Sequence, residues 1–256
     1  MKINIALAIS RDWFEYAVVT ATSILENSNS QDEYCFYILS NGFSDEEKDL
    51  FLKLKKLRDV DFKFITLDDS YFDDAIHDWL GVSASYRLRL QTFCPEDKVL
   101  YMDSDIVALK DLSELFNTDI SDYYVAAVED KSGHMMRCRI KSIKEGEPFF
   151  NSGVQLINLN KFRENNVEEK FMEVLRSHGI YTDQDAMNDV CYGNILSLPL
   201  KYNIVPCEEY KHRREEAVEA IADPVLLHYW SKPWQASTRV SRYNDWYKYK
   251  DIYDNL

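Results

Sequence analysis

The stretch YMDSDIVAL, residues 101–109, places two carboxylates, Asp103 and Asp105, one residue apart at the end of an apolar run. The residues before them, 98–102, have the composition of a buried strand. In an extended segment, residues i and i+2 lie on the same face, so the two carboxylates converge on one point. Carboxylates this close repel each other unless a cation or a shared proton lies between them. The sequence therefore predicts a cation at the end of this strand.

Apolar runs typical of strands alternate along the chain with segments typical of helices. We expect strands over residues 3–9, 34–39, 62–67, 98–102, 124–128, 154–159 and 225–229. We expect helices over residues 13–26, 83–93, 111–117, 161–177 and 185–191, and one that opens with the capping box Ser44–Glu47. This order predicts an α/β fold with a largely parallel sheet, helices on both faces, and ligands at the carboxyl ends of the strands.

The length of 256 residues is sufficient for one substantial hydrophobic core. We expect one domain over residues 1–236 and a tail, 237–256, that is rich in Tyr and Lys and packs on it. Residues 131–147, which are basic, and residues 201–214 are predicted to be loops.

The composition limits the classes of partner. A formal net charge of −14 argues against a nucleic-acid partner. No apolar run approaches the roughly 18 residues of a membrane span, which leaves only peripheral membrane contact open. The five cysteines form no C-x-x-C pair, so we expect a reduced, cytoplasmic protein. The seven glycines form no phosphate-binding loop, so a bound phosphate would need a metal.

Three further polar stretches lie at the predicted ends of elements. They are FFNSGVQLINL (149–159), TDQDAMN (182–188) and LLHYWSKPW (226–234). Each has a structural explanation by itself: a turn, a helix cap, and a hydrogen-bonded histidine. Their joint occurrence with the acid pair favours a functional site instead.

These residue types fit one task. Two carboxylates and the imidazole of His228 can fill about half of an octahedral Mn²⁺ or Mg²⁺ shell. The remaining positions suit a diphosphate. Lys232 would then neutralise the charge of a departing diphosphate, with the metal acting as a Lewis acid.

The ordered set YRLRL, KVLYMDSDIVALKDLSELF, FNSGVQLINL, DQDAMN and HYWSKPW resembles the family 8 glycosyltransferases, in a match that runs from about residue 3 to residue 234. These are retaining enzymes that include bacterial lipopolysaccharide galactosyl- and glucosyltransferases and glycogenin. The resemblance implies the GT-A fold, a Rossmann-like, mostly parallel sheet flanked by helices. It also implies transfer of glucose or galactose from a UDP-sugar to a glycan, lipid-linked or protein acceptor in cell-surface polysaccharide biosynthesis.

The resemblance also assigns the site. Mn²⁺, with Mg²⁺ as the alternative, would be held by Asp103, Asp105 and His228. The donor would be bound by Ala8, Ser10, Asp12, Trp13, Arg87, Ser104, Asn151, Ser152 and Lys232, with the uridine at residues 8–13. The catalytic residues would be Asp183, Gln184 and Asp185. Among these, Asp185 is the better candidate for a nucleophile or ion-pair stabiliser, and front-side attack is the competing route.

Two motifs depart from the family. AISRDW places Ser10 where the family usually has an acid that faces uracil, although a hydroxyl can still bond to a uracil edge and Trp13 can stack. HYWSKPW is shorter than the family's H-F-x-G-x-x-K-P-W, so the loop that carries Lys232 must be tighter.

Two other functions are compatible with parts of this sequence. An apolar strand that ends in D-x-D also resembles the opening of haloacid-dehalogenase-type phosphatases, in which the first Asp is the nucleophile. That strand usually lies near the N-terminus, whereas residues 1–97 precede it here. A non-catalytic sugar-nucleotide-binding protein is the third candidate, because a fold does not fix a function.

Overall fold

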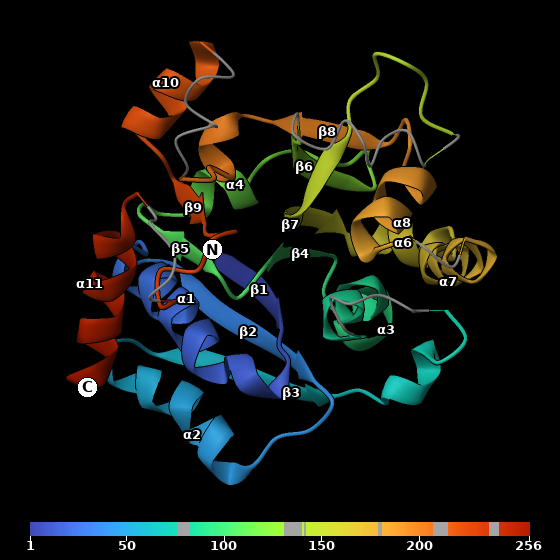
Figure 1. Cartoon of the computed structure of the whole chain (residues 1–256). Helices are drawn as coiled ribbons and strands as arrows, with labels where there is room; N and C mark the ends of the chain where they lie inside the picture. Colours follow the sequence, from blue (N-terminus) through green and yellow to red (C-terminus); the bar gives the residue numbers. More distant parts are fainter. Residues whose placement is uncertain (76–81, 131–139, 141, 179–180, 207–214, 236–240) are drawn as a thin grey trace.

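The computed structural model describes the chain except for residues 76–81, 131–139, 141, 179–180, 207–214 and 236–240 (Figure 1). Its described part contains a seven-stranded sheet with the order β3-β2-β1-β4-β7-β6-β8. The strands are β1 (Lys2–Ala8), β2 (Glu33–Ser40), β3 (Val60–Thr66), β4 (Lys98–Met102), β6 (Val125–Glu129), β7 (Phe150–Asn158) and β8 (Ile195–Leu198).

The directions of the strands show where a ligand site is expected in this sheet. β1 pairs in parallel with β2 and β4, and β2 pairs in parallel with β3. The chain builds β2 and β3 on one side of β1 and then returns to place β4 on the other side, which makes a topological switch point. Ligands of open α/β sheets bind at such a point, outside the carboxyl ends of the strands. β7 is antiparallel to both β4 and β6. The sheet is therefore mixed, and the α/β prediction is confirmed.

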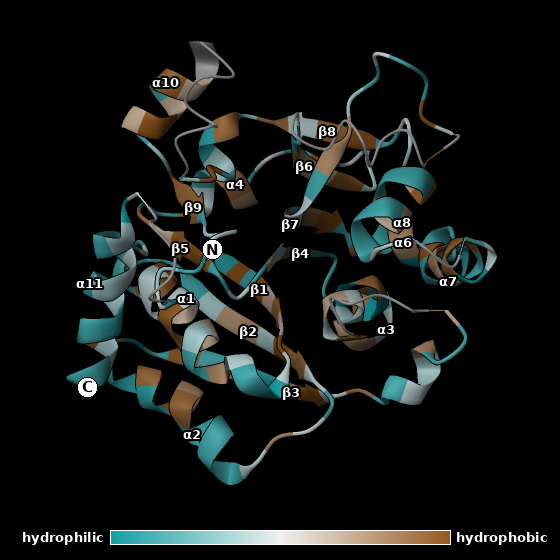
Figure 2. Ribbon diagram, in the orientation of Figure 1, coloured by the Kyte–Doolittle hydropathy of each residue, from teal (hydrophilic) through white to brown (hydrophobic). Residues whose placement is uncertain are grey.

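Helices cover both faces of the sheet (Figure 1). They are α1 (Phe14–Glu26), α2 (Asp45–Leu52), α3 (Leu90–Phe93), α4 (Ser113–Phe116), α6 (Leu159–Glu164), α7 (Val167–Ser177), α8 (Asp183–Val190), α10 (Glu215–Ala222) and α11 (Tyr243–Asp254). Side chains alternate along β1: Ile5 and Leu7 enter the core shared with α1 and α11, and Ala6 enters the core shared with α7. Figure 2 shows hydrophobic strands within a rim of helices that are hydrophilic outside.

Several elements differ from the sequence-based expectation. The helix expected over 161–177 is two helices, α6 and α7, because Asn166 adopts a left-handed conformation with φ +50°. Residues 82–89 form a 3₁₀ helix before the single turn of α3. The strand expected at 225–229 is β9 (Leu226–His228), which pairs antiparallel with β5 (Ile106–Ala108) in a second, two-stranded sheet. β7 begins at Phe150, so the N-S-G stretch lies inside a strand.

The C-terminal segment packs on the domain through α11. Trp246, Tyr249 and Tyr253 are buried in the same core as α1, and Asn27, directly after α1, donates to the hydroxyl of Tyr249 at 2.7 Å. The capping box at Ser44 is present as predicted. Most of the basic loop predicted at 131–147 lies outside the described residues. In the described part of the chain, no helix is long and apolar enough to cross a membrane.

Candidate active site

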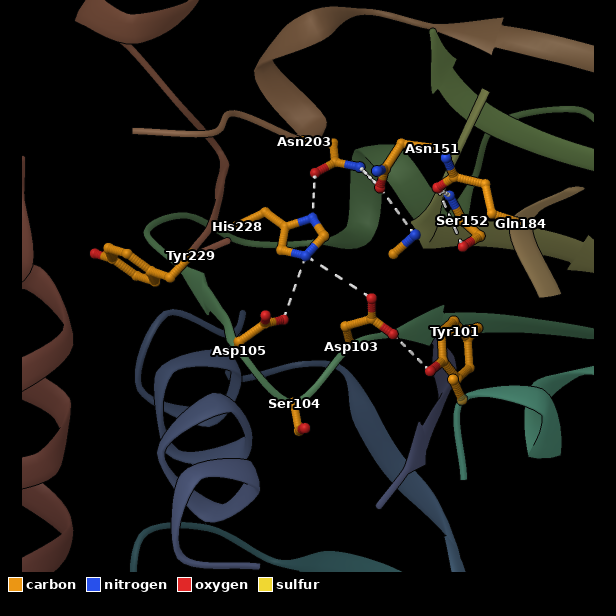
Figure 3. A network of polar contacts seen from close by, with 12 residues as sticks. Tyr101, Asp103, Ser104, Asp105, Asn151, Ser152, Gln184, Asn203, His228 and Tyr229 are labelled. Atoms are coloured by element: carbon orange, nitrogen blue, oxygen red, sulfur yellow. Dashed lines mark hydrogen bonds and ion pairs between the residues drawn. The ribbon is translucent and has the colours of Figure 1, made fainter. Parts of the chain in front are cut away.

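Asp103, Asp105 and His228 come together at the carboxyl end of β4 (Figure 3). The two acids lie on the short link between β4 and β5, and the pairing of β5 with β9 places His228 opposite Ile106. Nε2 of His228 lies 3.3 Å from Oδ1 of Asp105 and 3.8 Å from Oδ2 of Asp103. One ligand atom from each residue lies within 4.8 Å of the others, so the three can hold a metal ion.

Two observations test whether the group fits a cation. Oδ1 of Asp105 is buried and has no hydrogen-bond partner among the described residues. A buried carboxylate oxygen without a partner is costly, and a cation would satisfy it. In addition, a Cβ on Gly153 would lie 2.8 Å from Oδ2 of Asp103 and 2.3 Å from Cε1 of His228. The glycine leaves room for the ligand side chains, and the residues fit a divalent cation.

Arg87 joins the acid pair to the D-Q-D stretch. Its Nη2 lies 2.8 Å from Oδ1 of Asp103, and its Nε lies 3.2 Å from Oδ2 of Asp183. Nη1 also donates to the carbonyl of Ser152 at 2.7 Å. Burial lowers the pKa of Arg87, but the two carboxylates outweigh that effect and raise it. Burial also raises the pKa of Asp183, against the opposing charge of Arg87. Arg87 is thus a buried, permanently charged group between Asp103 and Asp183.

Lys232 forms an ion pair with Oδ2 of Asp105 and donates to the carbonyl of Tyr229 at 2.9 Å. Burial of Asp105 opposes its ionisation, but the charge of a protonated His228 and the charge and hydrogen bond of Lys232 hold the pKa of Asp105 well below its ordinary value. Asp105 is therefore a carboxylate at neutral pH. In the structure, the ammonium of Lys232 thus lies beside a ligand atom of the acid pair, at the wall of the cavity.

The D-Q-D stretch begins α8. Thr182 is the N-cap, and Asp185 completes a capping box in which its Oδ2 accepts from the backbone N of Thr182 at 2.9 Å. Asp185 is fully buried. Gln184 points the other way: its Oε1 accepts from the backbone N of Ser152 at 2.9 Å, and its Nε2 donates to Asp130 at 3.3 Å. The capping position directs the carboxylate of Asp185 back onto its own helix.

A cavity of ≈ 630 Å³ contains this arrangement. Most of the residues predicted from the sequence line it: Ala8, Ser10, Trp13, Arg87, Asp103, Ser104, Asp105, Asn151, Ser152, Asp183, Gln184, His228 and Lys232. Asp12 and Asp185 are not among the lining residues. Asp12 is exposed at the start of the helix that follows β1, and Asp185 is occupied as a cap. The cavity therefore joins the carboxyl end of β1 to α8 across the acid pair.

The structure adds residues that the sequence reasoning missed. Asp130 lines the cavity directly after β6, and Trp230 lines it with 43% of its surface exposed. Asp130 follows the same rule as the acid pair, because it is an acid at a strand end, and could have been found from that signal. Asn203 is buried and places Oδ1 3.0 Å from Nδ1 of His228. It lies in a segment predicted only as a loop, and no sequence signal marks it.

The comparisons with known proteins agree with this geometry. The profile of glycosyl transferase family 8 matches residues 4–238. General stress protein A of Bacillus subtilis is 24% identical over 89% of this chain and 85% of its own length. A lipopolysaccharide 1,2-glucosyltransferase of Escherichia coli is 28% identical over 99% of this chain and 77% of its own length.

Among solved structures, the galactosyltransferase LgtC in complex with donor and acceptor sugar analogs superposes with a TM-score of 0.83. The superposition covers 98% of this chain and 96% of LgtC at 23% sequence identity, which shows a shared GT-A fold. The phosphatase alternative is not favoured, because the acid pair follows β4 in the middle of this sheet and not a strand near the N-terminus.

Proposed function

The chain belongs to glycosyl transferase family 8, and from that premise we propose that it transfers glucose or galactose from a UDP-sugar in a reaction that depends on Mn²⁺, with Mg²⁺ as the alternative. The observation that carries the proposal is the group formed by Asp103, Asp105 and His228 within one large cavity, with Lys232 against it.

The metal ligands would be Asp103, Asp105 and Nε2 of His228. Oxygen and imidazole ligands suit Mn²⁺ and Mg²⁺. A bound divalent cation would supply positive charge to the diphosphate leaving group. Lys232 would add a second positive charge at the diphosphate. To do so, its ammonium would leave the carboxylate of Asp105 and bind a phosphate oxygen. Its ammonium is held by Asp105 and the carbonyl of Tyr229 and lies at the wall of the cavity that would take the diphosphate.

The remaining walls suggest the position of the donor. Ser10 and Trp13, at the end of β1, offer a hydroxyl and an aromatic ring for a uracil base. Asn151, Asp183 and Gln184 offer an amide, a carboxylate and a second amide for sugar hydroxyls. The guanidinium of Arg87 is already paired with Asp103 and Asp183. Arg87 would therefore hold these two carboxylates in position and would not contact the donor itself. Gln184 and Asp183, not Asp185, are proposed to face the reacting carbon.

The acceptor is proposed to be a glycan, a lipid-linked precursor or a protein, used in cell-surface polysaccharide biosynthesis. Curated relatives that include a lipopolysaccharide glucosyltransferase support this class of acceptor. We propose a cytoplasmic location and peripheral contact with a membrane where the acceptor is lipid-linked. The net charge of −14 gives no support to a nucleic-acid partner.

The test is metal-dependent UDP release from a panel of UDP-sugars, with Mn²⁺, Mg²⁺ or excess EDTA. Wild-type protein should release UDP from UDP-glucose or UDP-galactose only with metal, and Asp105→Asn should lose this activity while it stays folded. Asp122→Asn, at an exposed position, is the matched control. Full activity in EDTA would contradict the proposal. Phosphate release from phosphomonoesters would indicate a phosphatase, and UDP-sugar binding without turnover would indicate a non-catalytic protein.

A further inference from the structure

We propose that Asn203 is a positioning residue whose single amide sets both the direction of the His228 lone pair and the orientation of the Asn151 amide. The inference rests on the proposed function, since it assigns His228 to the metal and Asn151 to the donor sugar. Four groups form one run of hydrogen bonds: the backbone N of Gly153, Asn151, Asn203 and His228 (Figure 3).

The polarity of this run follows from its first member. The backbone N–H of Gly153 can only donate, and it lies 2.9 Å from the side chain of Asn151. The Asn151 atom at that position must therefore be the oxygen. Asn203 lies 2.7 Å from the same atom, so Asn203 must present its NH₂ group there.

The rest of the run is then determined. With its NH₂ group directed at Asn151, Asn203 directs Oδ1 at Nδ1 of His228, 3.0 Å away. An amide oxygen can only accept, so Nδ1 must carry the ring proton. A metal ligand must be the neutral imidazole, which carries only this one ring proton, so in that form the lone pair is on Nε2. Nε2 is the nitrogen that faces Asp105 and Asp103 at 3.3 and 3.8 Å.

In the neutral imidazole, the lone pair of Nε2 faces the two carboxylates, which is the arrangement of a metal site; without a metal, a second ring proton on Nε2 would pair with the same carboxylates. Three electron-rich groups around one point repel each other unless a cation or a proton lies between them, and a bound metal would supply the cation. An imidazole metal ligand commonly donates its other N–H to a neighbouring oxygen, which fixes the tautomer and the ring orientation. Asn203 supplies that oxygen in this chain.

The amide of Asn203 also orients Asn151, the residue proposed to contact the donor sugar. Oδ1 of Asn151 already accepts two hydrogen bonds, so this side chain must direct its Nδ2 elsewhere. Asn151 lines the cavity, and among the described residues no hydrogen bond from its Nδ2 is found. An NH₂ group in this position selects an acceptor on the donor, such as a sugar hydroxyl oxygen. Asn203 therefore connects the two halves of the site.

The position of Asn203 explains why it can act on both residues. Residues 203–205 lie alongside β9, where the backbone N of His228 donates to Ile204 at 2.8 Å and Ile204 donates to Leu226 at 3.1 Å. Asn203 and His228 are both buried, so the amide is shielded from competing water.

Two substitutions separate the two effects. Asn203→Leu has nearly the same size and removes both hydrogen bonds. Asn203→Asp keeps an acceptor for the Nδ1–H of His228 but places an oxygen against Oδ1 of Asn151, which should turn the Asn151 amide. We expect Asn203→Leu to weaken Mn²⁺ binding about 10- to 100-fold, the usual effect of losing a partner of a metal ligand. Asn203→Asp should keep Mn²⁺ affinity within about threefold and lose about tenfold in affinity for the UDP-sugar but not for UDP.

The readouts do not require turnover. Calorimetry with Mn²⁺ in the presence of UDP or of a UDP-sugar gives the affinities. Long-range ¹H–¹⁵N NMR of the imidazoles gives the tautomer, with the His228 signals identified by their loss in His228→Gln. When the imidazole is neutral, wild-type protein should show the proton on Nδ1, and Asn203→Leu should show a mixture. Asn158→Leu is the control. It removes a hydrogen bond to the carbonyl of Ile120 and the cap of α6, both outside the cavity. It therefore shows how much affinity is lost when only the stability of the fold decreases.

The failures are distinguishable. If wild-type protein binds no divalent cation with UDP, the proposed function fails, and the NMR tautomer still tests Asn203. If wild-type protein binds Mn²⁺ but Asn203→Leu leaves both the tautomer and the affinity unchanged, only this inference is overturned. If Asn203→Leu does not fold, Asn203→Asp decides: equal losses of UDP-sugar and UDP affinity would contradict the separation of the two effects.

Discussion

Gly153 and His228 are in direct contact: a Cβ on residue 153 would lie 2.3 Å from Cε1 and 2.9 Å from Nδ1 of the imidazole. The two chain segments cannot easily move apart. The backbone N of Asp103 donates to the carbonyl of Gly153 at 2.9 Å, and Met102 pairs with Val154 in the sheet. β7 therefore forms one wall of the metal group, and only a glycine leaves room for it.

Gly153→Ala should consequently damage metal binding. The added methyl group would push the imidazole away from Asp103 and Asp105, and we expect Mn²⁺ affinity in the presence of UDP to fall at least about tenfold. Calorimetry measures this loss. Gly193→Ala is the control, because its φ of +77° makes alanine strained while no atom lies within 4 Å of the new Cβ. It should cost about 1 kcal/mol of stability and leave the affinity unchanged. Unchanged Mn²⁺ affinity in Gly153→Ala would refute the contact.

The sequence predicted the parts of this site that depend on local pattern. An acid pair after an apolar strand, and a histidine at the end of another, could be placed at strand ends from periodicity alone. A helix start within TDQDAMN was also predicted, although the helix was expected from residue 185 and α8 begins at Asp183 with Thr182 as its N-cap. Gln184 and Asp183 reach the cavity because the cap fixes the start of α8.

The contacts between distant segments could not be predicted. Asn203 reaches His228 only because residues 203–205 lie beside β9, and the pairing of β5 with β9 was not foreseen. The role of Gly153 depends on the distance from β7 to an imidazole 75 positions later in the chain. The resemblance favours Asp185 as a nucleophile because the D-Q-D stretch would lie beside the donor sugar, whereas in the structure its carboxylate completes the capping box of α8 and Asp185 is not among the residues that line the cavity.

Lys232→Met should change the affinities for metal and nucleotide in opposite directions. Without a cation, the ammonium of Lys232 pairs with Asp105 and competes with a metal for that carboxylate. Its removal should strengthen binding of Mn²⁺ alone by about threefold, the scale of a partly exposed ion pair. UDP binding should weaken by about tenfold or more, because a charged donor to the diphosphate is lost. Calorimetry with Mn²⁺ alone and then with UDP separates the two. Weaker binding of Mn²⁺ alone would mean that Lys232 does not compete for Asp105.

The lowered pKa of Asp105 predicts a dependence of stability on pH in metal-free protein. A carboxyl whose pKa in the folded state lies below its ordinary value of 3.8 stabilises the fold above that value, and this stabilisation is lost as the pH falls toward the lowered pKa. The free energy of unfolding should therefore decrease from about pH 4 downward, and more steeply in wild-type protein than in Asp105→Asn. Urea titrations from pH 6 to pH 3 measure the slope. Equal slopes would show that Asp105 has an ordinary pKa.

Trp234 should control the loop that carries Lys232. Its ring stacks on Tyr16 of α1 with centroids 4.0 Å apart, lies 5.1 Å from Trp246 of α11, and meets Trp13 edge-on at 5.6 Å. Trp234→Ala should weaken UDP binding about tenfold and cost about 2 kcal/mol of stability, while Mn²⁺ affinity stays the same. Trp234→Phe should restore most of both losses. Equal losses of Mn²⁺ and UDP affinity would instead indicate a general collapse of the site.

The stereochemistry of the reaction tests the proposed mechanism. An inverting enzyme needs a carboxylate base that deprotonates the acceptor on the face opposite the leaving group. The carboxylates that line the described cavity wall are Asp103, Asp105, Asp130 and Asp183. The first two are proposed metal ligands. Asp183 pairs with Arg87, and Asp130 accepts a hydrogen bond from Gln184.

We therefore expect retention, with an α-linked product from an α-linked UDP-sugar. A covalent intermediate and front-side attack guided by the departing phosphate both retain the configuration, so the prediction does not depend on which route operates. Proton NMR of the product decides it, since the anomeric coupling differs between α and β linkages in gluco- and galacto-configured sugars. A β-linked product would refute retention and would make Asp130, a cavity carboxylate that is neither a proposed metal ligand nor paired with Arg87, the first candidate for the base. Asp130→Asn would then abolish transfer, whereas under retention it should leave donor hydrolysis measurable.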